Sequence, residues 1–217
     1  MIFEIYKKTF SVLLQKPARL WALSLLAGVL VGLSWVLFGL VPGIALGLSI
    51  LFSASLCLVF LRGYRGQEIN AENLFDCFRN KETVKRVLLG MLWQDLWIFL
   101  WGCIPIIGIF FAIYKFYSYR FTLHILVEEP EIGITDALKV SMERSQGKCG
   151  SMFGADALIL LAAAAGYGIL LLFAQIPFIG ILFRVVLILF SVAVCLLLPL
   201  LLGLNEAAIY DTYGQKK

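Results

Sequence analysis

A proline followed three residues later by a glycine occurs twice inside long apolar sequence: "IPIIG" at 104–108 and "IPFIG" at 176–180. A looser version, "VPGIALG", begins at Val41. Proline lacks a backbone N–H and fixes φ, whereas glycine tolerates positive φ, so together they end one helix and begin the next. These stretches are uncharged, so each predicts a tight turn that joins two apolar helices into a hairpin. The turn residues are Pro42, Pro105, Gly108, Pro177 and Gly180.

The composition of the chain is that of a membrane protein. Of its 217 residues 61% are hydrophobic and 15% are charged, and the mean hydropathy is +0.93. Soluble domains are nearer half apolar and a quarter charged. In a bilayer every backbone N–H and C=O must be satisfied internally, which leaves helices or closed barrels. Because the apolar runs are continuous rather than alternating, they predict an all-α integral membrane helical bundle.

Six apolar runs have the length of about 20 residues that a transmembrane helix needs. They pair around the three turns, so the sequence predicts six transmembrane helices arranged as three hairpins in a single transmembrane domain over 1–217. The predicted spans are 20–40, 41–61, 84–103, 106–127, 151–174 and 178–202.

The lysines and arginines predict the orientation. They precede the first span, fill the two long loops and end the chain, whereas the three turns carry none. The basic residues that lie between the spans or at their ends are Lys7, Lys8, Lys16, Arg19, Arg62, Arg65, Arg79, Lys81, Lys85, Arg86, Lys139, Arg144, Lys148, Lys216 and Lys217. By the positive-inside rule the sequence predicts a multi-pass protein of the cell membrane with both termini cytoplasmic and the turns facing outward.

Amphipathic segments accompany the spans. Residues 1–16 predict an interfacial helix whose apolar face lies in the headgroup region while Lys7 and Lys8 meet anionic lipid headgroups. Three further segments predict cytoplasmic surface helices: "AENLFDCFRN" from Ala71, "ITDALKVSME" from Ile134 and "NEAAIYDTYG" from Asn205. Each follows a turn by about thirty residues, which is compatible with an internal triplication.

From Arg62 onward the sequence resembles one family. The stretches are "RGYRGQEINAENLFDCF", "IPIIGIFFAIYKFYSYRFTLHILVEEPEIGITDALKVSMERSQGK" and "AAIYDTYG". They resemble the uncharacterised six-span membrane-protein family of Gram-positive bacteria called domain of unknown function nine-seven-five. The resemblance implies a helical membrane bundle. The family has no established activity and no catalytic residues that could be carried over to this chain.

Four ionisable side chains fall inside apolar runs: Asp95, Lys115, Arg120 and Arg184. A charge at membrane depth costs about 2.5–3.5 kcal/mol on insertion scales, so it is expected to be paired or functional. Asp95 and Lys115 lie in one predicted hairpin, each roughly 12–15 Å below its turn. They form either a structural ion pair or part of a proton or ion path. Arg120 either extends to headgroups or binds substrate or lipid, and Arg184 can extend outward.

A polar aromatic stripe continues from these charges. Tyr114, Tyr117 and His124 lie in the same predicted span as Arg120, and Tyr117, Arg120 and His124 share a helix face by their spacing of three and four residues. The stripe either lines a hydrated cavity or forms hydrogen bonds between helices.

Signatures of enzymes and cofactors are missing from the sequence. It contains no H-E-x-x-H, G-x-S-x-G or phosphate-loop motif. The five cysteines are scattered singly and there is one histidine, so the spacing offers no ligand set for a metal and predicts no cofactor. No nucleic-acid partner is predicted. The leading hypothesis is a non-enzymatic scaffold or assembly factor that acts through lipids, a membrane-protein partner or a second copy of the chain. The alternative is a small transporter or channel with a polar path near Asp95, Lys115 and Arg120.

Overall fold

The computed structural model describes residues 2–15, 17–176 and 180–214, and in this part of the chain helices joined by turns and loops are the regular structure, without a strand. The predicted all-α fold is therefore confirmed. The elements in chain order are α1 (Ile2–Gln15), α2 (Pro17–Phe38), α3 (Pro42–Tyr64), the 3-10 helix η1 (Ala71–Phe78), α4 (Lys81–Gly102), α5 (Gly108–Ser118), α6 (Thr122–Glu128), α7 (Ile134–Ser145), α8 (Cys149–Phe173), α9 (Gly180–Ile209) and the π-helical turn η2 (Tyr210–Gly214).

Four helices in the described residues are long and apolar enough to cross a membrane. They are α2 from Ala18, α3, α8, and α9 together with η2. The chain therefore has the helices of a multi-pass membrane protein. The predicted spans 84–103 and 106–127 are not among the four.

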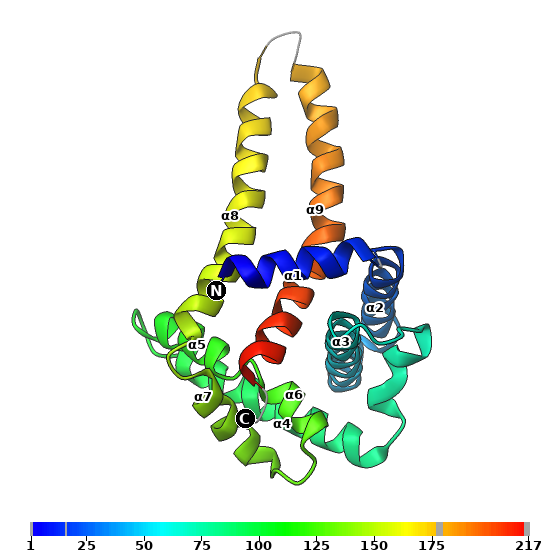
Figure 1. The fold of residues 1–217 in the computed structure, drawn as a ribbon, viewed down its shortest axis with the longest axis vertical. Coiled ribbons are helices and arrows are strands. Elements are labelled where there is room, and N and C mark those ends of the chain that lie inside the picture. Colours follow the sequence, from blue (N-terminus) through cyan, green and yellow to red (C-terminus); the bar gives the residue numbers. More distant parts are fainter. Residues whose placement is uncertain (1, 16, 177–179, 215–217) are drawn as a thin grey trace.

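The helices α8 and α9 form a long hairpin that projects from the rest of the molecule (Figure 1). Few of their residues are buried, and the exposed side chains are mostly large and apolar, such as Leu161, Leu172, Ile181 and Leu182. Only the base of the hairpin enters the helical body formed by α2 to α7. An apolar surface of this kind is stable in lipid rather than in water.

Helix α1 crosses the base of this hairpin (Figure 1). The Tyr6 hydroxyl donates a hydrogen bond to the carbonyl of Ala155 in α8. Thr9 and Val12 are buried, whereas Lys7 and Phe10 are exposed. The predicted amphipathic helix is therefore present, with one face packed on the protein.

The first two turns that contain proline and glycine lie where the sequence predicts them, and Gly180 of the third begins α9. Pro42 is the first residue of α3, where its missing N–H costs no helical hydrogen bond. A Cβ at Gly108 would lie 2.4 Å from the carbonyl oxygen of Trp101, and one at Gly180 would lie 2.5 Å from that of Ala174. Both glycines are thus required by the close approach of the preceding helix end. Pro177 lies outside the described residues.

The predicted span 106–127 is wrong as one continuous helix. It divides into α5 and α6, which are separated by residues 119–121. The break is stabilised by α7: the hydroxyls of Ser141 and Ser145 donate to the Ser118 carbonyl, and the Phe121 N–H donates to the Ser141 hydroxyl oxygen. These side chains form hydrogen bonds with backbone groups that lose their helical partners at the break. The interruption therefore costs little folding free energy.

The third predicted surface helix, "NEAAIYDTYG", is also wrong. Its residues continue α9 and η2 into the core, where Asn205, Ala207, Ala208 and Tyr210 are buried. The core lies where the base of the α8–α9 hairpin meets α2, α3 and α6. Its fully buried members include Leu20, Leu61, Ile125, Leu204 and Tyr210.

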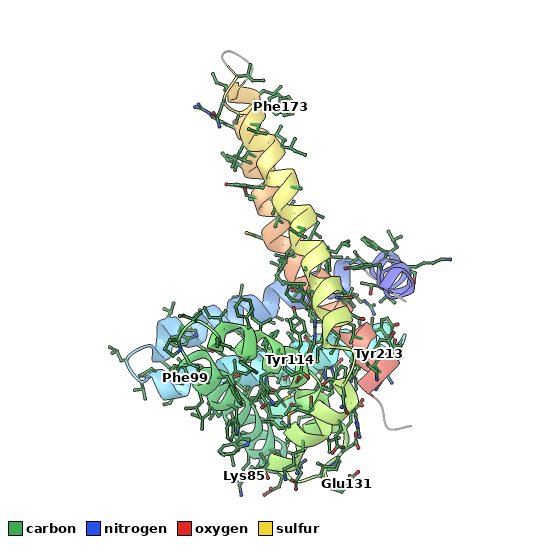
Figure 2. All side chains as sticks on the ribbon, turned by 90° about the vertical axis from the view of Figure 1, so that its left-hand side faces the viewer. Lys85, Phe99, Tyr114, Glu131, Phe173 and Tyr213 are labelled. Carbon is green, nitrogen blue, oxygen red and sulfur yellow. The ribbon has the colours of Figure 1, made fainter. Side chains whose placement is uncertain are left out.

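The three turns do not gather at one end of the molecule. Phe173 marks the tip of the projecting hairpin, whereas Phe99, near the end of α4, lies at the side of the helical body (Figure 2). Lys85 and Glu131 lie at the end of the body farthest from Phe173 (Figure 2). Four of the six predicted spans thus correspond to a helix of membrane-spanning length, and the tips of the α4–α5 and α8–α9 hairpins point in different directions.

Candidate functional site

A polar cluster lies where the base of the α8–α9 hairpin meets α3, α5 and α6. We define it by its members: Cys57, Tyr117, Arg120, His124, Asp156, Asn205 and Glu206. Arg120 is placed in it by the break between α5 and α6, because a residue in that break is turned toward α8 and α9.

Arg120 and Asp156 form the buried ion pair of the cluster. Nη1 of Arg120 lies 2.5 Å from Oδ2 of Asp156, and the two side chains are 7% and 9% exposed. Nε of Arg120 lies 3.9 Å from Oε2 of Glu206, which is 27% exposed. The predicted extension of Arg120 to the headgroups is thus wrong: a carboxylate from α8 and one from α9 surround its guanidinium.

Asp156 accepts hydrogen bonds from three side chains. Besides Arg120, the Asn205 amide donates to Oδ1 over 2.7 Å and the Tyr117 hydroxyl donates to Oδ2 over 3.3 Å. A buried charge is tolerated when it is paired and its remaining lone pairs are satisfied. The arrangement meets both conditions, and it connects α5, α8 and α9 with the break that holds Arg120.

Cys57, His124 and Glu206 form the other half of the cluster. The Cys57 thiol donates to Oε1 of Glu206 over 3.4 Å, and its Sγ lies 3.5 Å from Nε2 of His124. The His124 ring is fully buried and stacks on Tyr210, with centroids 4.0 Å apart and planes inclined by 20°. A thiol, an imidazole and a carboxylate from α3, α6 and α9 thus face one another.

Two cavities flank Cys57 and Glu206. One has a volume of about 430 Å³ and is lined in part by Tyr117, Arg120 and Asp156. The other has a volume of about 360 Å³ and is lined in part by Asp95. Cys57, Glu206 and Ser53 border both cavities. The geometry therefore connects the region of Asp95 with that of Arg120 through Cys57 and Glu206.

The structure does not pair Asp95 with Lys115. Within the described residues no ion pair joins them; the Lys115 ammonium instead lies 3.4 Å from Sδ of Met142 and above the rings of Trp101 and Tyr119. Similar depth below a turn is not enough for contact, because the rotation of each helix decides which way the side chain points. The predicted structural pair is therefore wrong.

The other predicted site residues are divided between the cluster and the surface. Tyr117 and His124 belong to the cluster although they lie on different helices. Tyr114 is half exposed on α5, and Arg184 is exposed on the projecting part of α9. Sequence reasoning missed Asp156, Asn205, Glu206 and Cys57. Each is a polar residue within or at the end of an apolar run, and this position in the sequence is the signal that could have identified it.

Ion pairs and hydrogen bonds in the helical body engage several of the basic residues that the positive-inside rule placed on the cytoplasmic side. Arg65 pairs with Glu128 and Asp211, and Arg144 pairs with Glu129 at 2.5 Å. The hydrogen bond with Glu129 raises the pKa of Arg144.

Two further arginines contact the protein. Arg62 pairs with Asp76, and Arg86 donates to the carbonyls of Leu126, Glu129 and Ile132. Exposed lysines such as Lys81 and Lys85 remain at the surface of the body.

Comparison with models of protein families, with curated proteins and with solved structures finds no significant match to this chain.

Proposed function

We propose that this chain is a non-enzymatic membrane scaffold or assembly factor that acts through lipid or protein contacts. The observation that carries the proposal is the pairing of Arg120 inside the polar cluster. A charge that is neutralised by Asp156 and approached by Glu206 has a structural partner within the chain, so it needs no substrate to explain its position.

The projecting hairpin supplies the surface for such contacts. Its large apolar side chains face outward along α8 and α9. Between α1 and this hairpin lies a cavity of about 640 Å³, lined by Phe10, Phe190 and other apolar side chains. Lipid tails fit this surface, and so does an apolar helix of a partner protein or of a second copy. The exposed lysines at the far side of the body fit anionic headgroups.

In this proposal the chain lies in a bacterial cell membrane as six spans in three hairpins, with both termini cytoplasmic. The support is the placement of Lys and Arg in the sequence. Cys103 offers a direct check, because it is exposed at the turn between α4 and α5. In intact cells a membrane-impermeant maleimide labels Cys103 if that turn faces outward. Membership of the domain of unknown function nine-seven-five family is part of the same proposal and rests on the three motif stretches.

A small transporter or channel is the second candidate, and the two cavities favour it. They extend the polar region from Arg120 past Cys57 and Glu206 to Asp95. Lys115 is not part of this path, because it lies against Trp101 and Met142.

Water access to Ser53 distinguishes the two candidates, since Ser53 borders both cavities. The experiment replaces the five cysteines by serine, introduces Ser53→Cys and measures labelling by a charged, water-soluble thiol reagent in membranes. Lys85→Cys is the water-exposed control and Leu172→Cys the lipid-exposed control. A scaffold predicts labelling of Ser53→Cys as low as that of Leu172→Cys. Labelling near that of Lys85→Cys would favour transport instead.

A further inference from the structure

We propose that Cys57, His124 and Glu206 bind a zinc ion that joins α3, α6 and α9. The three residues are separated in sequence by 67 and 82 positions (57 to 124, and 124 to 206), so no ligand spacing is visible in the chain. The fold nevertheless brings their ligand atoms, Sγ, a ring nitrogen and a carboxylate oxygen, to within 4.8 Å of one another.

The distances between these atoms fit tetrahedral coordination. Zinc bonds of about 2.3 Å to sulfur and about 2.0–2.1 Å to nitrogen or oxygen place neighbouring ligand atoms about 3.5 Å apart. In the structure Sγ of Cys57 lies 3.5 Å from Nε2 of His124 and 3.4 Å from Oε1 of Glu206. A zinc ion would therefore bind with little change in the distances from Cys57 to His124 and from Cys57 to Glu206.

The His124 imidazole and the Cys57 thiol can both take the protonation state that zinc binding requires. Nε2 of His124 faces Cys57 and Glu206. A neutral imidazole with its proton on Nδ1 presents the Nε2 lone pair to the ion. On binding, the S–H bond of Cys57 breaks, the Zn–S bond forms and the proton leaves to solvent.

Charge balance favours a divalent ion. In the polar cluster one guanidinium, that of Arg120, stands against two carboxylates, those of Asp156 and Glu206. This leaves one excess negative charge when the thiol is protonated. Exchange of one proton for Zn²⁺ neutralises it. A thiolate and an imidazole select zinc and its neighbours over magnesium or calcium, which prefer oxygen ligands.

A fourth position is available for water. The cavity of about 360 Å³ beside Cys57 and Glu206 exceeds the volume that a water molecule requires. Three protein ligands with one open position are typical of zinc sites that retain a water. Asp95 lines the same cavity, where its carboxylate can accept a hydrogen bond from such a water.

The first test uses the wild-type full chain in detergent, freed of metal and titrated with Co²⁺ as a spectroscopic substitute for zinc. The expected result is a thiolate-to-cobalt charge-transfer absorption that saturates at one ion per chain and disappears when zinc is added. Cys57→Ser is expected to abolish the absorption, and Cys149→Ser, which replaces a buried cysteine hydrogen-bonded to Ser145, to leave it unchanged. Absence of the absorption in the wild type, or its persistence in Cys57→Ser, overturns the proposal.

A second measurement needs no variant. The wild-type chain is alkylated with a small maleimide with and without zinc, and the modified cysteines are mapped by mass spectrometry. Zinc is expected to protect Cys57 and to leave the exposed Cys103 reactive. Equal modification of Cys57 in both conditions would overturn the proposal even if Cys57→Ser did not fold.

Discussion

The two ends of the α8–α9 hairpin belong to the same two apolar helices but have opposite environments. Toward the tip, Leu172 and Ile181 are exposed apolar side chains that contact little of the protein. At the base, Asp156 and Asn205 are buried and hydrogen-bonded to each other. Hydropathy describes both ends as membrane helix, but only the base is held by specific contacts. The stability of the fold is therefore expected to depend on the base far more than on the tip.

The largest effect is expected from Asp156→Leu. The substitution leaves the Arg120 guanidinium buried without its main partner, and removal of one partner from a buried pair costs about 3–5 kcal/mol. The measurement is the free energy of unfolding in detergent. Asp156→Asn is the matched control, because it keeps the shape and an acceptor oxygen and is expected to cost less. A Leu variant as stable as the wild type would mean that Arg120 is already hydrated.

A smaller loss is expected from Gly203→Ala at the base. A Cβ at this position would lie 2.2 Å from the ring of Phe60 in α3. Overpacking of this kind costs about 1–3 kcal/mol. Gly168→Ala in the projecting part of α8 is the control, since a Cβ there meets no atom within 4 Å. If Gly203→Ala and Gly168→Ala unfold at the same denaturant concentration, the expected difference between the base and the projecting part of the hairpin is contradicted.

Arg144→Met is expected to cost roughly 1–2 kcal/mol, between the values for surface and buried ion pairs. The side chains of Arg144 and Glu129 are each 14% exposed, and Arg144 also donates to the carbonyl of Gly214. Loss of this contact should make the C-terminal segment more accessible to carboxypeptidase. Arg79→Met, at an arginine that is 61% exposed, is expected to leave both stability and digestion unchanged.

The smallest effect is expected from Leu172→Ala near the tip. This side chain is 71% exposed, so its truncation leaves no cavity and should change the free energy of unfolding by less than about 0.5 kcal/mol. The measurement is the same unfolding experiment in detergent. A loss as large as that of Gly203→Ala would show that the tip is covered by a second copy of the chain, and size-exclusion chromatography would then be expected to detect the oligomer.

The parts of the fold that depend on local composition were predictable. The Pro/Gly turns, the amphipathic α1 and the four longest apolar helices follow from chain stiffness and hydropathy. The break at residues 119–121 was not predictable, because its backbone groups are satisfied by Ser141 and Ser145, twenty or more residues later.

Only part of the polar cluster was predictable from the sequence. Arg120 was identified because a charge in an apolar run needs a partner. Its partners were missed because Asp156 and Glu206 lie near helix ends, where hydration would also explain a carboxylate. Whether such a group meets water or Arg120 depends on how α8 and α9 pack on α5, which the local sequence does not specify. The same limit explains the wrong pairing of Asp95 with Lys115.

The most direct measurement is a double-mutant cycle on Arg120→Met and Asp156→Leu, with Asp95→Asn and Lys115→Met as the control cycle. The structure predicts that the Arg120–Asp156 double variant recovers much of the loss of the single variants, with a coupling of roughly 2–3 kcal/mol, and that the control pair shows almost none. Independent effects of Arg120 and Asp156, or a larger coupling between Asp95 and Lys115, would contradict the polar cluster as the structural centre of the molecule.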